Sequence, residues 1–214
     1  MLLPYSPQLG LTDHTGGTAL VWAAKNGCDE MADLLIKYGA DIEIPDNAGQ
    51  TPLLCAIKED YEDIAASLIE AGANVDMKDQ EGHFPLIWAV RRNWGNIISR
   101  LLEHGANLDV QDLNGGTALI CAAVDKRRDV FFQLMVYNPR MNIFDDMGRT
   151  ALIWAAQKGC GEMVDLLLQR GANPKIKDKL GKTALHWAKT EGHERIARNL
   201  LDYEGMSNTS KTTL

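Results

Sequence analysis

Residues 183–188 read Thr-Ala-Leu-His-Trp-Ala, and this stretch decides the fold. Asp178 and Gly181 precede it, and the apolar pair Leu200-Leu201 follows it. The same arrangement recurs along the chain, and it begins each time at an aspartate that stands 33 residues from the next: Asp13, Asp46, Asp79, Asp112, Asp145 and Asp178. A fixed period of this length indicates a repeat protein, in which like positions line up in columns.

The residue chemistry of one period predicts a turn followed by two helices. Asp-x-x-Gly is typical of a tight turn, because glycine accepts positive φ and aspartate bonds its own backbone. Threonine follows in five of the six periods as a helix N-cap, and Phe84 replaces it in the third. Pro52 and Pro85 fit the first helical position. A later Gly-Ala pair predicts the end of the second helix in four periods, at Gly39, Gly72, Gly105 and Gly171.

This unit resembles the ankyrin repeat, whose signature is similar to Thr-Pro-Leu-His-x-Ala. Residues 183–188 come closest to it, and the other five periods replace the histidine with Val21, Leu54, Ile87, Ile120 and Ile153. The resemblance covers residues 13 to about 205. It implies an all-α repeat solenoid of six ankyrin repeats, namely 13–45, 46–78, 79–111, 112–144, 145–177 and 178–205. The family binds many unrelated partners, so the resemblance implies protein binding and names no partner.

The ends of the chain differ from its middle. Leu2-Leu3 fall in register with the apolar pair Leu35-Ile36, so residues 1–12 are interpreted as an N-terminal stub or partial repeat. The alternative is that the chain is a fragment or isoform of a longer array. Residues 206–214 are predicted to be a disordered tail. Its last residues, Thr212-Thr213-Leu214, resemble a ligand of PDZ domains, which capture a C-terminal carboxylate.

Composition narrows the classes of partner. The net charge of −7 disfavours a nucleic-acid-binding surface, which needs concentrated Lys and Arg. No apolar run approaches the roughly 18 residues of a membrane-spanning helix, so membrane insertion is not expected. The four cysteines form no Cys-x-x-Cys pair and are too sparse for a disulfide scaffold. We therefore expect a reducing setting, cytoplasmic or nuclear.

One column of the first helix holds most of the tryptophans. Nine residues after each turn aspartate stand Trp22, Cys55, Trp88, Cys121, Trp154 and Trp187. Helical spacing places this column opposite the apolar side, and in the ankyrin family that face lines the concave groove. Tryptophan is enriched at interface hot spots, and the small cysteines between indoles would leave hollows. The alternative is that the tryptophans pack only against adjacent helices and turns.

Basic residues lie beside this column. Lys25, Lys58 and Arg91 form a basic line, with Arg92 next to Arg91, and Lys126-Arg127-Arg128 extend it in the next inter-helix loop. Gln157 and Lys158 occupy the positions of Arg91 and Arg92 later in the chain. This line suits a partner with acidic residues around apolar anchors, although it is equally typical of a solvated face neutralised by nearby Glu and Asp. The turn tips form a second predicted wall. The candidate partner-binding residues are Trp22, Trp88, Trp154, Trp187, Lys25, Lys58, Arg91, Arg92, Gln157, Lys158, His83, Met147 and Arg149.

Catalysis and metal binding find no support in the sequence. Cys28, Cys160 and His193 share one column, but a linear array keeps them in separate repeats, so no metal site is predicted. No phosphate-binding loop or nucleophile–base motif appears, and we expect neither an enzyme nor a cofactor. The leading hypothesis is an intracellular protein-interaction module that binds a peptide or domain in its groove. The alternatives are a stoichiometric inhibitor or regulatory subunit of an enzyme or transcription factor, and a piece of a larger ankyrin scaffold or effector.

Overall fold

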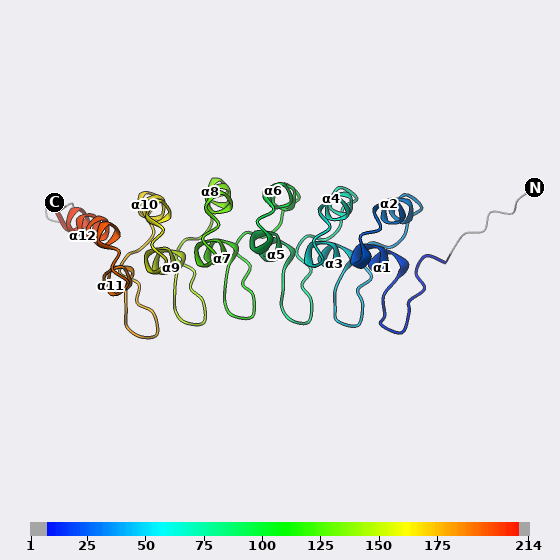
Figure 1. Cartoon of the computed structure of the whole chain (residues 1–214), viewed down its shortest axis with the longest axis horizontal. Helices are drawn as coiled ribbons and strands as arrows, with labels where there is room; N and C mark the ends of the chain where they lie inside the picture. The colour runs from blue at the N-terminus through cyan, green and yellow to red at the C-terminus, as the bar shows by residue number, and fades with distance from the viewer. Residues whose placement is uncertain (1–7, 210–214) are drawn as a thin grey trace, which may run out of the picture. The chain divides into compact units, whose positions relative to one another are not determined.

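The chain folds into helix pairs joined by hairpin-like turns (Figure 1). A computed structural model describes residues 8–209, and within that range there are twelve α-helices and no strand of a sheet. They fall into two compact units, Met1–Asn107 and Leu108–Leu214, with six helices in the described part of each. The predicted all-α repeat fold is confirmed.

In the first unit the helices form an inner and an outer row. The six helices are α1 (Ala19–Asn26), α2 (Asp29–Lys37), α3 (Pro52–Lys58), α4 (Glu62–Glu70), α5 (Pro85–Arg92) and α6 (Gly95–Glu103). The inner helices α1, α3 and α5 pack in sequence, and so do the outer helices α2, α4 and α6. Each repeat contributes one helix to each row.

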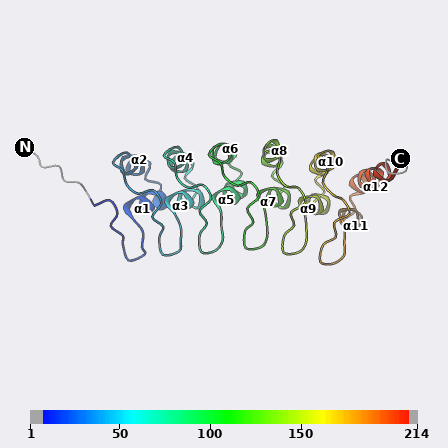
Figure 2. The same cartoon turned by 180° about the vertical axis from the view of Figure 1, so that it is seen from behind.

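The second unit repeats this plan. Its helices are α7 (Ala118–Val124), α8 (Arg128–Val136), α9 (Ala151–Gln157), α10 (Gly161–Gln169), α11 (Ala184–Thr190) and α12 (Glu194–Thr209). The inner helices α7, α9 and α11 pack in order, and the outer helices α8, α10 and α12 form the second row (Figure 2).

The turn aspartate closes its own turn, as the sequence predicts. Asp46 Oδ1 accepts hydrogen bonds from the amides of Ala48 and Gln50, both at 2.9 Å. All six aspartates make the same two bonds to the amides two and four residues later. The glycine three residues after each aspartate has positive φ. Each turn is therefore closed by hydrogen bonds among its own residues, without help from a neighbouring repeat.

The predicted helix caps are also confirmed. Thr150 Oγ1 accepts a hydrogen bond from the amide of Ile153 at 3.3 Å, and the equivalent threonines of four other repeats do the same. Phe84 stands at this position in the third repeat and makes no side-chain cap bond. The Ile87 amide of α5 consequently lacks the side-chain acceptor that the same amide has in the other repeats.

The short turn between the two helices of a repeat requires a left-handed residue. Gly27 fills it in the first repeat with φ of 66°, and a Cβ there would lie 2.1 Å from the Tyr61 ring. In the middle repeats the same place is taken by non-glycine residues, among them Lys126 with φ of 56°. Asn138 likewise replaces a glycine at the end of α8, with φ of 54°.

Adjacent repeats within a unit are linked by two sets of hydrogen bonds. Turn tips bond through the backbone, for example from the Lys179 amide to the Met147 carbonyl at 2.9 Å. The second set joins a side chain to the backbone of the next repeat. The side chain thirty residues after each turn aspartate accepts a hydrogen bond from a backbone amide of the following repeat. The acceptors are Glu43, Asp76, Asp109 and Asn142. The sequence analysis did not identify this second set.

The core lies between the rows, where the sequence placed it. Leu20, Ala23 and Ala24 are at most 1% exposed, and their counterparts form the buried side of each inner helix. Of the phenylalanine pair in α8, Phe131 is fully buried and Phe132 is half-buried beneath the Arg128 guanidinium.

Helix α12 continues to Thr209, past residue 205, where the sequence placed the end of the last repeat. The Leu2-Leu3 pair of the predicted stub and the PDZ-like residues Thr212-Thr213-Leu214 lie outside the described residues. Among residues 8–209, no helix combines the length and apolar character needed to span a bilayer.

Candidate functional site

The second carboxylate oxygen of the turn aspartate connects the turn to the tryptophan column. Trp154 Nε1 donates to Asp145 Oδ2 at 2.7 Å, and Trp187 Nε1 donates to Asp178 Oδ2 at 2.8 Å. Trp154 is half-buried and Trp187 is 8% exposed. Burial alone would raise the pKa of Asp178, but hydrogen bonds from the Lys182 amide and the Trp187 indole outweigh it and lower that pKa.

Arg149 lies between these two indoles. Its guanidinium carbon is 4.6 Å from the Trp154 ring centre and 4.4 Å from that of Trp187. The same side chain donates to Asp178 Oδ2 at 3.3 Å and to Gln157 Oε1 at 3.0 Å. Arg149 is 8% exposed, so its cation is committed to neighbours within the unit. Such a desolvated cation–π arrangement stabilises the packing of the fifth repeat against the sixth.

Two lysines extend this stack at its ends. Lys158 Nζ lies 5.8 Å from the Trp154 ring, and Lys182 Nζ lies 4.3 Å from the Trp187 ring. Met147, at the turn tip, is 54% exposed, whereas Gln157 and Lys158 are half-buried. The candidate surface of the second unit therefore consists of Met147 and the lysines, over a largely buried aromatic layer.

In the third repeat a histidine takes the place of the indole at the turn aspartate. His83 Nδ1 lies 3.1 Å from Asp79 Oδ2, and its ring centre is 5.1 Å from that of Trp88. Trp88 Nε1 is buried and has no hydrogen-bond partner among the described residues. Arg91 and Arg92 flank the Trp88 ring at 5.9 and 5.8 Å. The competition between His83 and Trp88 for one oxygen explains the orphaned indole N–H.

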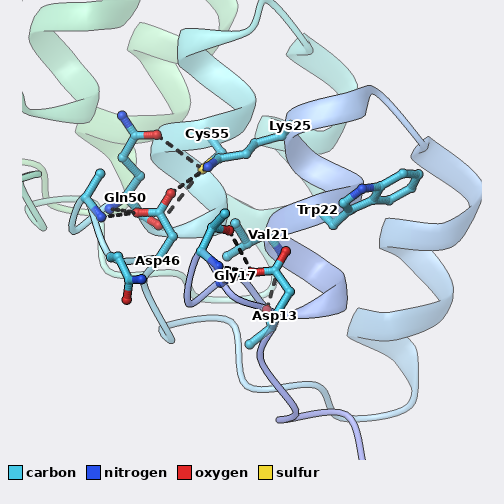
Figure 3. Close-up of polar contacts among 12 residues, drawn as sticks. Asp13, Gly17, Val21, Trp22, Lys25, Asp46, Gln50 and Cys55 are labelled. Atoms are coloured by element: carbon cyan, nitrogen blue, oxygen red, sulfur yellow. Dashed lines mark hydrogen bonds and ion pairs between the residues drawn. The ribbon is translucent and has the colours of Figure 1, made fainter.

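Figure 3 shows the equivalent region of the first two repeats. Lys25 Nζ reaches across to Asp46 Oδ2 at 2.6 Å, whereas the Trp22 indole extends away from this network. Burial would raise the pKa of Asp46, but hydrogen bonds from Lys25 and the Gln50 amide outweigh it, so the pKa is lowered. Trp22 is 49% exposed.

The pairing behind these differences is visible in the sequence, although the sequence analysis missed it. The residue five positions before the tryptophan is basic in three repeats and covers or engages the indole: His83, Arg149 and Lys182. Before Trp22 that residue is Gly17, which has no side chain to cover the ring. Trp22 is accordingly the most exposed of the four column tryptophans.

At Cys55 the structure does not show the hollow that was expected beside the small cysteine. Cys55 is fully buried, and its thiol lies 3.9 Å from both the backbone and side-chain oxygens of Gln50. Cys121 is 7% exposed. The side chain of Gln50 fills the space that a smaller residue was predicted to leave.

Of the remaining candidates in the first unit, Lys58 is half-buried and Arg92 is exposed. Arg92 donates to the Lys58 carbonyl oxygen and lies 3.8 Å from Asp60 Oδ1. Lys25, Lys58, Arg91 and Arg92 all belong to this unit, and Arg91 and Arg92 flank Trp88. Lys25 and Arg92 already have partners within the chain.

One group of potential metal ligands was not anticipated. The side chains of Asp79, Glu81 and His83 place their ligand atoms within 4.8 Å of one another. Asp79 Oδ1 already accepts two backbone amides, and Glu81 is exposed. These distances are those of a closed turn with a histidine hydrogen-bonded to it. A cavity of about 520 Å³ lies elsewhere, between the loops around Asp109 and Phe144, and none of the candidate residues lines it.

Asp-closed turns, paired helices and in-register columns define a helical repeat protein whose candidate sites are surfaces made by successive repeats. The chain belongs to the ankyrin-repeat family. The family model described as "Ankyrin repeats (3 copies)" matches residues 1–79, 67–145 and 125–212. Ankyrin repeats are protein–protein interaction modules and their fold is a non-enzymatic one.

Solved structures with the same fold include three ankyrin domains. An ankyrin repeat domain from Acinetobacter baumannii AYE is 34% identical with a TM-score of 0.81, over 86% of this chain and 97% of that one. The ankyrin repeat protein EF0377 is 28% identical (TM-score 0.80; 89% and 98% covered). The ankyrin repeat domain of Bcl-3, described as a unique member of the IkappaB protein family, is 27% identical (TM-score 0.77; 89% and 87% covered). A comparison with curated proteins finds no significant match.

Proposed function

We propose that this chain binds a protein or peptide through the inner-helix and turn surfaces of its repeats. The observation that carries the proposal is Trp22, an indole left 49% exposed while its equivalents are covered by the residue five positions earlier. Tryptophan is enriched among interface hot spots and contributes strongly when a partner buries it.

The cations of each unit favour an acidic partner. Lys58 is half-exposed beside the Lys25–Asp46 pair, and Arg92 is exposed on the next repeat. In the second unit, Lys158 and Lys182 cap the aromatic stack. A segment with an apolar anchor flanked by Asp or Glu would complement these cations. In this proposal Trp22, Lys58 and Arg92 of the first unit touch the partner. The second unit offers a separate surface, in which Met147 and Lys158 are the contacting residues and the buried Arg149 and Trp187 hold them in place.

The test uses the full chain as bait in a cell extract from which bound proteins are identified by quantitative mass spectrometry. The variants are Trp22→Ala and the double variant Lys58→Glu/Arg92→Glu. The matched control is Val136→Ala, which removes an apolar side chain that is 71% exposed on the outer helix α8. Circular dichroism of each variant checks that its helices are retained.

We expect Trp22→Ala to lower recovery of the specific partner about tenfold or more, as interface hot spots do, and Val136→Ala to leave recovery unchanged. Retention of every wild-type partner by both Trp22→Ala and the charge-reversal variant would contradict the proposal. If the recovered partner is an enzyme, titrating the chain against its activity separates an inhibitor from an adaptor. We also propose that the chain acts in the cytoplasm or the nucleus.

A further inference from the structure

The hairpin at residues 173–182, which lies between α10 and α11, is the most basic turn of the chain. It contains four lysines and one aspartate, which give it a net charge of +3. The lysines are Lys175, Lys177, Lys179 and Lys182. The equivalent ten-residue segments of the other five repeats carry net charges between −3 and 0, with histidine counted as neutral. Positive charge is therefore concentrated in this segment, called the basic hairpin below, although the whole chain carries −7.

Three of these lysines are available to a partner. Lys175, Lys177 and Lys179 are exposed, and their side chains form no hydrogen bond or ion pair with any other residue from 8 to 209. Asp178, by contrast, is 5% exposed, and its Oδ2 accepts hydrogen bonds from Trp187 at 2.8 Å and from Arg149 at 3.3 Å. The one carboxylate of the basic hairpin therefore does not neutralise the exposed ammonium groups.

An apolar side chain stands at the tip of the same hairpin. Leu180, two residues after the turn aspartate, is 68% exposed, and its equivalent Met147 in the fifth repeat is 54% exposed. The two tips lie side by side, because the Lys179 amide donates to the Met147 carbonyl oxygen at 2.9 Å. In the first four repeats the same position holds Thr15, Ala48, Glu81 and Asn114. Large apolar residues at this position therefore occur only in the fifth and sixth repeats, whose hairpins extend away from the helices (Figure 1).

We propose that the basic hairpin docks the chain on a membrane surface that contains anionic lipids. Its ammonium groups would lie at the lipid phosphates, while Leu180 and Met147 enter the boundary between headgroups and acyl chains. Clusters of about four to eight basic residues are attracted to anionic leaflets, and each lysine adds to the affinity.

Two features favour a bilayer over an acidic protein segment. All the cations of the basic hairpin are lysines, whose ammonium groups move on flexible stems and suit mobile headgroups, whereas the planar fork of arginine fits an acceptor pair of fixed geometry. The apolar side chains are at protruding tips, so they can enter a fluid surface without a matching cavity in the partner. Docking of this kind needs no membrane-spanning helix. It goes beyond the proposed protein binding, since Trp22, Lys58 and Arg92 of the first unit take no part in it.

One exposed carboxylate gives the proposal a prediction of opposite sign. Asp146 neighbours Met147 at the tip of the fifth repeat, where an anionic membrane would repel it. Asp146→Lys should therefore strengthen docking by about fivefold or more. Asp125→Lys, at an exposed site at the end of α7, is the matched control and should not strengthen it.

The test measures co-sedimentation of the full chain with lipid vesicles. One set of vesicles contains phosphatidylcholine mixed with phosphatidylserine, and the other contains phosphatidylcholine alone. A soluble fluorescent peptide rich in glutamate, with a single leucine as anchor, represents the acidic protein segment, and its binding is measured by fluorescence anisotropy.

The charge variant replaces the three exposed lysines of the basic hairpin with glutamine, as Lys175→Gln/Lys177→Gln/Lys179→Gln. Its control makes the same change at three exposed lysines elsewhere, as Lys37→Gln/Lys78→Gln/Lys189→Gln. Circular dichroism checks that helix content is unchanged, as expected for substitutions at exposed side chains.

The tip variant is Leu180→Gln, which removes the apolar side chain and leaves the lysines in place. Its control is Leu34→Gln, at a site 52% exposed on α2. Both changes replace one exposed leucine with a polar side chain of similar size, so they differ only in their position on the chain.

We expect saturable binding to the vesicles with phosphatidylserine and none to phosphatidylcholine alone. The charge variant should bind about a hundredfold more weakly, since each lysine near an anionic surface contributes about fivefold. Leu180→Gln should weaken binding about fivefold or more. Each control variant should change it by less than about twofold, because distant charges are screened.

Absence of vesicle binding, equal binding to the two kinds of vesicle, or equal loss in the charge variant and its control would overturn the proposal. So would unchanged binding of Leu180→Gln or no gain in Asp146→Lys, because the attraction would then not involve the hairpin tips. Tighter binding of the acidic peptide than of the vesicles would make a protein segment the occupant and would also overturn it.

Discussion

Arg149 is the residue on which the packing of the second unit converges. Two indoles, one carboxylate and one amide oxygen surround its guanidinium. The planar group stacks on both rings while its edge donates hydrogen bonds, a combination that lysine cannot reproduce. The turn position of Arg149 suggested a surface residue in the sequence, and its length lets it fold back into the layer between the two tryptophans instead.

The hydrogen bond from Trp154 to Asp145 gives a stability prediction. Trp154→Phe keeps most of the ring but removes the Nε1 donor and leaves Asp145 Oδ2 without that partner. We expect the free energy of unfolding to fall by about 1.5–3 kcal/mol, because hydrogen bonds to charged groups contribute about this much. Urea unfolding followed by circular dichroism measures it. Trp22→Phe, at a half-exposed indole that donates to no turn aspartate, should change stability by less than about 0.5 kcal/mol; equal effects would contradict the assignment.

Cys55 should be an unusually unreactive cysteine. Its burial raises the pKa of the thiol from 9.0 to about 12, so the reactive thiolate is scarce at neutral pH. In a chain with Cys28→Ser, Cys121→Ala and Cys160→Ser, we expect Cys55 to react with a thiol reagent at pH 8 only through opening of the fold. Its labelling should be at least about a hundredfold slower than in urea. Rapid labelling of the native chain would show that the Gln50 cover is open.

At the level of the elements, the turn between α7 and α8 carries local strain. Lys126 has φ of 56° in a place where the first, fifth and sixth repeats use glycine. A left-handed conformation costs a residue with a Cβ about 1–2 kcal/mol, and Asn or Asp bears it better than Lys. The second and third repeats have Asp60 and Asn93 there. The fourth repeat thus has the least suitable residue for this turn.

Lys126→Gly should therefore stabilise the chain. Removal of the strain is partly offset by the greater freedom of glycine in the unfolded chain, so we expect a gain of about 0.5–1 kcal/mol. Thermal unfolding by calorimetry measures the shift. Asp125→Gly, one residue earlier where φ is −86°, is the control and should not stabilise. A lower melting temperature for Lys126→Gly would contradict the strain argument.

Most elements of this fold could be predicted from the sequence because their determinants are local. Thr150 caps α9 through its own side chain, and Asp46 closes its turn within five residues. The second inter-repeat bond set escaped notice because its acceptors vary, from Glu43 to Asn142, and only their spacing is constant. The site was harder to predict. Trp22 is exposed because Gly17 has no side chain to cover its ring, and this depends on a second repeat position besides that of the tryptophan. The sequence analysis considered each position along the repeats separately and therefore overlooked it.

For the whole molecule, the turn aspartates make stability depend on pH. The pKa values of Asp13, Asp46 and Asp178 are all lowered in the folded chain from their ordinary value of 3.8. For Asp13 the first cause is the hydrogen bond from the Thr15 side chain. For the other two, hydrogen bonds outweigh the opposing effect of burial. A carboxyl with a lowered folded-state pKa contributes stability above its unfolded pKa and loses that contribution as the pH falls through the folded value.

We therefore expect the melting temperature to be nearly constant from pH 7 to 5 and to fall below about pH 4, where the unfolded chain binds more protons. Asp46→Asn tests one contributor, because it removes the charge that pairs with Lys25. This variant should be less stable than wild type at pH 7, and the difference should shrink toward pH 3. A difference that stays constant over this range would show that the charge of Asp46 is unimportant.

Each turn aspartate accepts hydrogen bonds only from amides two and four residues ahead of it. A turn can therefore form as soon as its five residues leave the ribosome. Packing between repeats needs helices that arrive 33 residues later, but the turn that directs the chain toward them has already formed. Synthesis from the N-terminus would then add one pre-bent repeat after another to the growing stack. The nascent chain would need to search for few distant contacts.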